Sequence, residues 1–364
     1  MKRYFFAIIP ALVMILLVGD SSRAEESTFE KIRAAAEDYS KGGRPFHINA
    51  KALYESMVSS MPGSIDVRYF DSFLFKKGPI IVDLRNPCPE MPDPYVLGHI
   101  PGAIHIPWKK IAEWRYLRDL PKDRKILVYS NTGQIGGHVS AILNILGYDA
   151  VNLMWGMTSW TASADVAPGR YDKSRDTVWS LGGSYRTVVQ INEPQETHDL
   201  PNREKIGSHD TFEAILSVTR QYLNASDISF TISAPELDRL LRSSANLFLI
   251  PFVLDVRDDE AFRLGHIDNC LHIPLNALFK RENLKRLPPH RQIVVYCETG
   301  HESGHAAALL SLLGYDAVSL KWGITAWSLS LPGRNIAPNR YDEKRDCMDY
   351  EVATGFRPSI PCPG

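Results

Sequence analysis

The sequence predicts an α/β protein built from two copies of one unit, each a parallel, doubly wound sheet flanked by helices. Two matches carry this prediction, and both recur 167 positions later in the chain. Leu97–Ile100 returns as Leu264–Ile267, and Leu146–Val151 returns as Leu313–Val318. Within each copy, short β-branched runs alternate with apolar helical patterns, an order typical of parallel sheets. Units of this length indicate a duplicated domain, because repeat arrays use units of about 20 to 50 residues.

The N-terminal residues 1–24 have the pattern of a signal peptide. Two basic residues precede an apolar stretch, Tyr4–Gly19, and Ser22–Ala24 has the small-x-small form that signal peptidase reads. The apolar stretch is shorter than the roughly 20 residues of a membrane-spanning helix, so a retained anchor is the alternative and no membrane contact is expected after the signal is removed. We therefore expect a mature start at Glu25 and a periplasmic or secreted protein.

Charge and cysteine content limit the partners and the covalent bonds of the chain. With 41 basic and 42 acidic residues, the formal net charge is −1, which gives no electrostatic basis for a nucleic-acid partner. The five cysteines are an odd number, so at least one thiol stays unpaired within a monomer. We interpret Cys270 as a packed small side chain and Cys88 as exposed or paired, and a disulfide between Cys347 and Cys362 is an open alternative.

The internal matches divide the chain into two expected domains. Residues 25–176 form the first and residues 210–350 the second. Between them, residues 177–209 are rich in Gly, Asn, Pro and charge and read as a linker, and residues 351–364 form a C-terminal tail. Buried strands are expected at Ile80–Asp83, Ile126–Tyr129, Phe252–Asp255 and Ile293–Tyr296.

The loop that follows the last of these strands carries the candidate chemistry. In both copies such a loop leads into an apolar helix, His138–Leu146 or His305–Leu313, and ligands of parallel sheets bind where these loops emerge. In the second copy the loop begins with Cys297, which we predict to be the nucleophile. The rest of this loop forms the predicted substrate-binding segment: Glu298, Thr299, Gly300, His301, Glu302 and Ser303. Backbone N–H groups and the positive end of the helix are expected to lower the pKa of the thiol.

Five short motifs in the second copy resemble the rhodanese family in their usual order. They are Asp255–Arg257, Gly265–Ile267, His272–Pro274, Val295–Gly300 and Trp322–Trp327. The resemblance implies that Cys297 takes a sulfane sulfur from a small donor such as thiosulfate, holds it as a persulfide and yields it to a thiol or cyanide acceptor. Two half-reactions through a covalent enzyme form predict ping-pong kinetics. No cofactor and no metal are expected.

The first copy departs from this pattern at the decisive position. Its loop has Ser130 where the second copy has Cys297, and serine cannot form a persulfide. The first domain is therefore expected to be non-catalytic. The arrangement of an inactive N-terminal copy and an active C-terminal one resembles that of tandem rhodaneses.

The charges of the second loop predict its choice of donor. Two carboxylates, Glu298 and Glu302, are expected to face a bound dianion, and unit charges about 8 Å apart interact by roughly 2 kcal/mol at an effective dielectric of about 20. We therefore predict a high KM for thiosulfate and a preference for less charged persulfide donors. A protonated His301 would offset part of the repulsion at low pH, which predicts a bell-shaped pH profile.

Three other functions compete with sulfur transfer. His301–His305 spells the zinc-protease string H-E-x-x-H, but we place His301 in the loop ahead of the helix and reject a metal site. Phosphatases of the same fold need an arginine six residues after the cysteine, where this chain has Ser303. The alternative that stays open is a non-catalytic module that binds sulfur, senses it or docks a partner protein on a rhodanese scaffold.

Overall fold

The structure is a computed structural model. It describes residues 27–42, 45–59, 78–87, 92–176, 185–201, 210–225, 230–243, 250–328, 330–331 and 334–355. The expected signal peptide, Cys88 and Cys362 lie outside the described residues. Within the described ranges, none of the helices has the length and apolar character needed to cross a membrane.

Each copy contains a five-stranded sheet in which all neighbouring strands are parallel, which confirms the predicted fold class. The first sheet has the order β1-β5-β4-β2-β3, with β1 (His47–Ile48), β5 (Asp149–Leu153), β4 (Lys125–Tyr129), β2 (Ile80–Asp83) and β3 (Ile104–His105). The second has the matching order β7-β12-β11-β8-β10, with β7 (Thr231–Ile232), β12 (Ala317–Leu320), β11 (Ile293–Tyr296), β8 (Phe252–Asp255) and β10 (Leu271–His272).

The helices also repeat between the copies, although several are a single turn. The first copy has α1 (Thr28–Lys41), α2 (Ala50–Ser59), α4 (Pro94–Leu97), the 3₁₀ turn η2 (Trp108–Lys110), α5 (Trp114–Leu117), α6 (Gln134–Ile145), α7 (Met157–Trp160) and α8 (Lys173–Asp176). The second has α9 (Thr211–Asn224), α10 (Ala234–Leu241), α11 (Asp259–Leu264), α12 (Leu275–Leu278), α13 (Arg281–Leu284), α14 (His301–Leu313), α15 (Gly323–Trp327) and α16 (Glu343–Asp346). Two small antiparallel pairs complete the described elements: β6 (Thr187–Val188) with β9 (His266–Ile267), and β13 (Ser330–Leu331) with β14 (Arg334–Asn335).

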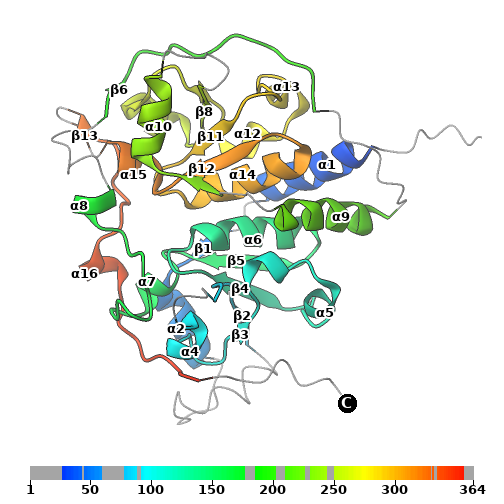
Figure 1. The fold of residues 1–364 in the computed structure, drawn as a ribbon, viewed down its shortest axis with the longest axis vertical. Coiled ribbons are helices and arrows are strands. Elements are labelled where there is room, and N and C mark those ends of the chain that lie inside the picture. Colours follow the sequence, from blue (N-terminus) through cyan, green and yellow to red (C-terminus); the bar gives the residue numbers. More distant parts are fainter. Residues whose placement is uncertain are drawn as a thin grey trace, which may run out of the picture.

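One apolar core joins the two copies. Figure 1 shows α6 and α14 lying between the two sheets, with α1 and α9 beside them, and α6 packs directly on α14. Successive residues of β4 point to opposite faces of the first sheet. Ile126 and Val128 pack in the core shared by the two domains. Leu127 and Tyr129 pack in a second core on the outer face of the first domain. This alternation follows from the two-residue period of a strand and places helices on both faces of each sheet.

The leading helices of the two copies cross between the domains. On α1, Arg33 donates to the carbonyl oxygen of Phe279 at 3.4 Å, so this helix lies against the second domain. On α9, Arg220 donates to the carbonyl oxygen of Ala112 at 2.9 Å, so its counterpart lies against the first domain. The domains are therefore interlocked by the helices that precede them in sequence.

The segments that follow each copy are exchanged in the same way. The indole of Trp327 donates to the carbonyl oxygen of Arg186 at 3.1 Å, and the indole of Trp160 donates to that of Glu351 at 2.9 Å. Residues 187–188 of the expected linker form β6 on the second domain, while Ala353 in the tail bridges to His99 of the first. Part of the expected linker and tail thus completes the opposite domain.

A buried ion pair explains one of the repeated motifs. Arg257 contacts Asp255 at 2.6 Å and also donates to the carbonyl oxygen of Gly265 at 2.8 Å. The first copy repeats this with Arg85, Asp83 and the carbonyl oxygen of Gly98. Each pair joins the end of a strand to the glycine of Gly-His-Ile, so the motif is structural in both domains.

Candidate active site

Cys297 lies at the carboxyl end of β11, immediately before the loop that leads into α14. This is the edge of a parallel sheet where binding residues are found, as the sequence predicted. The side chain is only 1% exposed and belongs to the core shared by the two domains. Any donor must therefore reach the sulfur through a narrow approach or after a movement of the surrounding loops.

The loop curls around the sulfur and directs hydrogen-bond donors at it. The backbone N–H of Gly300 donates to Cys297 Sγ at 3.1 Å, and the hydroxyl of Ser303 lies 3.4 Å from the same atom. Gly300 has a φ of +88°, in the left-handed region, and a Cβ there would also lie 2.9 Å from the backbone nitrogen of Trp322. The glycine is thus required for this turn. We call the groups around the sulfur, the Gly300 N–H and the Ser303 hydroxyl, the cradle.

The expectation that the cradle lowers the pKa of the thiol is wrong. Burial raises the pKa of Cys297, and the carboxylate of Glu302 raises it further. Hydrogen bonds from the side chain and backbone of Ser303 and from the backbone of Thr299 lower it, but they do not outweigh these two effects. The loop sequence indicates the N–H donors but not the burial of the thiol in the core that both copies form.

Of the two loop carboxylates, Glu302 and not Glu298 affects the pKa of Cys297. Glu298 is turned toward Asn339, whose side-chain amide donates to it at 2.8 Å and whose backbone N–H also binds it. Glu302 interacts electrostatically with Cys297, and burial together with Glu298 and Asp258 raises the pKa of its own carboxyl group. The predicted repulsion between the loop and a dianionic donor therefore rests on Glu302.

His301 is the first residue of α14, so placing it in the loop ahead of the helix was wrong. Both helices begin earlier than predicted, at Gln134 and His301, because Gly133 and Gly300 take left-handed conformations and the helix starts at the next residue. The polar first turns hid these starts from the apolar pattern. Burial lowers the pKa of His301 to about 4, so the protonated histidine that the bell-shaped profile needed is absent near pH 6.5.

The H-E-x-x-H string does place His301 and His305 one helical turn apart, but they face the domain seam. His305 Nδ1 lies 2.7 Å from the hydroxyl of Tyr39 on α1. Among the residues that the structure describes, no set of three or more His, Cys, Asp and Glu side chains is arranged to hold a metal ion.

Ser130 occupies the same cradle in the first domain. Its hydroxyl accepts hydrogen bonds from the backbone N–H of Gly133 at 3.1 Å and of Gly136 at 3.4 Å. The first loop therefore keeps the geometry of the second with an oxygen in place of the sulfur. Ile135 stands where the second loop has Glu302, so this cradle also lacks the carboxylate.

The two loops meet across the seam, which sequence reasoning missed. Thr132 and Trp155 of the first domain contact His301 of the second through their backbone groups. Gln134 also approaches the second loop, with its Nε2 3.2 Å from the place that a Cβ on Gly300 would occupy. The available signal was the repetition of Trp155 as Trp322, since both follow the strand next to a loop strand.

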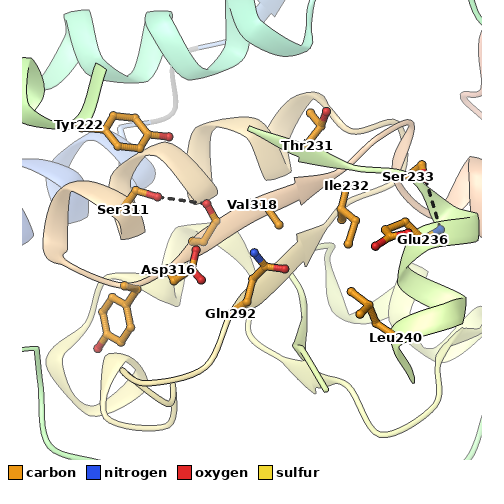
Figure 2. Close-up of a pocket in the computed structure, with 12 residues that line it drawn as sticks. Tyr222, Thr231, Ile232, Ser233, Glu236, Leu240, Gln292, Ser311, Asp316 and Val318 are labelled. Atoms are coloured by element: carbon orange, nitrogen blue, oxygen red, sulfur yellow. Dashed lines mark hydrogen bonds between the residues drawn. The ribbon is translucent and has the colours of Figure 1, made fainter. Parts of the chain in front are cut away.

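The structure also contains two pockets that are remote from this chemistry. One, of about 650 Å³, is lined by Thr231, Gln292, Asp316 and other residues at the amino ends of the second sheet (Figure 2). Its counterpart in the first domain measures about 910 Å³ and includes Asp149. Cys297 lines neither pocket and lies at the opposite, carboxyl end of its strand.

Of the other described thiols, Cys270 confirms its interpretation as a packed small side chain. Cys270 is buried with its sulfur 3.4 Å from the hydroxyl of Tyr296, and burial raises its pKa well above the ordinary value, as expected for a packed side chain. Cys347 carries a free thiol. The partner considered for it, Cys362, lies outside the described residues.

Comparison with known proteins identifies the family. The model of the rhodanese-like domain matches residues 65–163 and 233–330, which together make up more than half of the chain. The chain therefore belongs to the rhodanese family, in its tandem form with two such domains.

Individual relatives are similar at modest identity. "Probable adenylyltransferase/sulfurtransferase MoeZ" of Mycobacterium tuberculosis (strain CDC 1551 / Oshkosh) is 29% identical over 248 residues, which cover 65% of this chain and 57% of MoeZ. The chain thus spans little more than half the length of that relative. Thiosulfate sulfurtransferase PspE of Escherichia coli (strain K12) is 30% identical over 83 residues, or 22% of this chain and 78% of PspE. A solved rhodanese-like domain protein from Staphylococcus aureus is 28% identical and covers 28% of this chain and 92% of its own, with a TM-score of 0.25.

Proposed function

We propose that this chain is a sulfurtransferase that carries a sulfane sulfur as a persulfide on Cys297. The observation that supports it is the cradle, in which the N–H of Gly300 and the hydroxyl of Ser303 surround the sulfur at 3.1 and 3.4 Å. The same groups can stabilise the negative charge of a persulfide that replaces the thiolate. The names of the relatives, a probable adenylyltransferase/sulfurtransferase for MoeZ and a thiosulfate sulfurtransferase for PspE, agree with this chemistry.

The reaction follows from a thiolate in this position. The Cys297 thiolate attacks the outer sulfur of the donor, the bond within the donor breaks, and sulfite leaves from thiosulfate or a thiolate leaves from a persulfide donor. An acceptor, cyanide or a thiolate, then attacks the terminal sulfur of the enzyme persulfide and releases the Cys297 thiolate. Because the negative charge of Glu302 acts at the Cys297 sulfur, it would repel a dianionic donor there, and we propose a low-charge persulfide as the better donor.

The test is intact-mass measurement after incubation with thiosulfate or a low-molecular-weight persulfide. We expect one added sulfur in the unchanged chain and none in Cys297→Ser. Ser130→Ala is the matched control, since Ser130 occupies the equivalent cradle, and it should load and turn over normally. A sulfur that persists in Cys297→Ser would contradict the assignment. Loading without discharge to cyanide or a thiol would favour the alternative, a module that stores or senses sulfur.

We also propose that the protein is exported and works in the periplasm or outside the cell, with the small sulfur compounds as its partners. The support is the signal-peptide pattern of residues 1–24. Cell fractionation of the full chain, with the N-terminal sequence of the product, tests this proposal. A mature start at Glu25 in the exported fraction is expected, and an uncleaved cytoplasmic product would contradict it.

A further inference from the structure

We infer that His301 is a positioning residue that ties the Cys297 loop to the first domain, so that the domain without a nucleophile holds the other domain's cradle in its reactive shape. The inference builds on the proposed sulfur transfer at Cys297. It gives the first domain a part in the site that its Ser130 alone does not suggest.

One ring nitrogen of His301 contacts the backbone of the first domain twice. Its Nε2 lies 3.1 Å from the carbonyl oxygen of Thr132 and 3.3 Å from the backbone nitrogen of Trp155. The Trp155 ring also meets the imidazole edge to face, with ring centres 4.6 Å apart. With only 1% of the side chain exposed, His301 is enclosed by the two loops of the first domain that lie nearest to it.

The other ring nitrogen contacts the catalytic loop itself. His301 Nδ1 lies 2.9 Å from the hydroxyl of Thr299. Thr299 and Gly300 directly precede His301 in the turn that begins at Cys297, and the Gly300 N–H is the donor that contacts the sulfur at 3.1 Å. Fixing the imidazole ring therefore fixes the Thr299 hydroxyl and, through the same turn, the Gly300 N–H that stabilises charge on Cys297 Sγ.

A neutral imidazole bridges the loops in either tautomer. With hydrogen on Nε2, the ring donates to the Thr132 carbonyl and accepts from the Thr299 hydroxyl. With hydrogen on Nδ1, it donates to Thr299 and accepts from the Trp155 N–H. Because burial lowers the pKa of His301 to about 4, the ring is neutral at the pH values where a thiolate forms.

The repeat supplies an internal comparison. Gln134 is the counterpart of His301 at the start of α6, and it is also buried. Its Nε2 has no hydrogen-bond partner within the part of the chain that the structure describes. The tie across the seam is therefore one-sided: it is made by the loop that carries the cysteine and not by the loop that carries Ser130.

The experiment is a double-mutant cycle on the reactivity of Cys297. His301→Phe keeps an aromatic ring without hydrogen bonds, Thr299→Val removes the other end of the tie, and the third variant combines them. The readout is the rate of iodoacetamide modification of Cys297 against pH, followed by mass spectrometry of the peptide that contains it. We expect each single variant to slow the reaction of the thiolate about tenfold and to raise the apparent pKa of the thiol.

Non-additivity identifies a single tie. The combined variant should be no slower than the slower single variant, because either change already breaks the bridge. His301→Asn, which keeps an amide near the Nδ1 position, should recover part of the rate. His290→Phe is the matched control, because it makes the same exchange at an exposed site before the amino end of β11, and it should stay within about twofold of the unchanged chain. Single variants that react at the normal rate, or effects that multiply in the combined variant, would overturn the inference.

The same proteins separate this inference from the proposed function. In single-turnover loading with a persulfide donor, the His301→Phe and Thr299→Val variants should lose rate with an unchanged KM, since the tie acts on the sulfur and not on donor binding. If the unchanged chain forms no persulfide with any donor, the proposed function fails. The alkylation cycle decides the positioning role in either case.

Discussion

Acid should destabilise this protein well above the pH at which carboxylates begin to protonate. Three buried histidines, His138, His301 and His305, and the half-buried His47 lie at the domain seam. The ring centre of His47 is 5.2 Å from that of His305 and 5.5 Å from that of His301. The Nε2 atoms of His47, His138 and His305 have no hydrogen-bond partner among the described residues. Burial lowers the pKa of all four, and neighbouring histidines lower it further for His47 and His305.

The magnitude follows from the difference between folded and unfolded pKa values. Burial lowers the pKa to about 4 for His138 and His301 and to about 3 for His305, against about 6.5 in the unfolded chain. Because the folded pKa is the lower one, the unfolded chain binds more protons below pH 6.5 and stability falls as the pH falls. At pH 5 the pKa shift of each of the three histidines lowers the free energy of unfolding by about 2 kcal/mol. Together they lower it by about 6 kcal/mol, which is a large part of a typical folding free energy.

Denaturant unfolding at pH 7.5, 6.5, 5.5 and 5.0 measures this loss. His138→Gln removes one titrating ring, so the difference in free energy of unfolding between pH 7.5 and 5 should shrink by about 2 kcal/mol. His290→Gln is the control, because His290 is exposed and its replacement should leave the pH dependence unchanged. A free energy of unfolding that is flat between pH 7.5 and 5 would refute the reasoning, because it would mean that these rings are not held neutral by burial.

Two further predictions concern the charge beside the nucleophile. Ser130→Cys in a Cys297→Ser background places a thiol in the first cradle, where Ile135 replaces Glu302. Its pKa, from the pH dependence of iodoacetamide modification, should lie below that of Cys297, and an equal or higher value would exclude the role given to the carboxylate. Glu302→Gln should lower the pKa of Cys297 and reduce the KM for thiosulfate on the order of tenfold, since each charge pair about 8 Å apart contributes roughly 2 kcal/mol before screening. Glu298→Gln is the control in low-salt kinetics, because the Glu298 carboxylate is bound to the side-chain amide of Asn339. Equal effects of the two variants would contradict this geometry.

Local patterns were sufficient to predict the frame of the site. Strands such as Ile293–Tyr296 are continuous β-branched runs, and a cysteine directly after such a strand must lie at the carboxyl end of a parallel sheet. The repeat then predicted that Ser130 and Cys297 occupy equivalent places, and the structure shows the same cradle around both. These features depend on residues that are close together in the chain.

The contacts of the second loop with the first domain could not be predicted in this way, because they join distant parts of the sequence. Nothing in the period of a strand or helix indicates that Thr132 and Trp155 contact His301, or that α1 crosses to the second domain. The sign of the shift in the Cys297 pKa was missed for a related reason. Burial of the thiol outweighs the hydrogen bonds to it, and Cys297 belongs to a core to which both copies contribute.

The same contacts explain how the first domain can lack a nucleophile and still need its loop. The Ser130 hydroxyl accepts from the Gly133 and Gly136 N–H groups, and the backbone of the same loop presents the Thr132 carbonyl to His301. An oxygen is as able as a sulfur to accept these hydrogen bonds, so the scaffold tolerates the serine although the sulfur chemistry does not. Since the helices and end segments of the copies are exchanged, neither domain has a complete core by itself. The unit that we propose for sulfur transfer is therefore the interlocked pair.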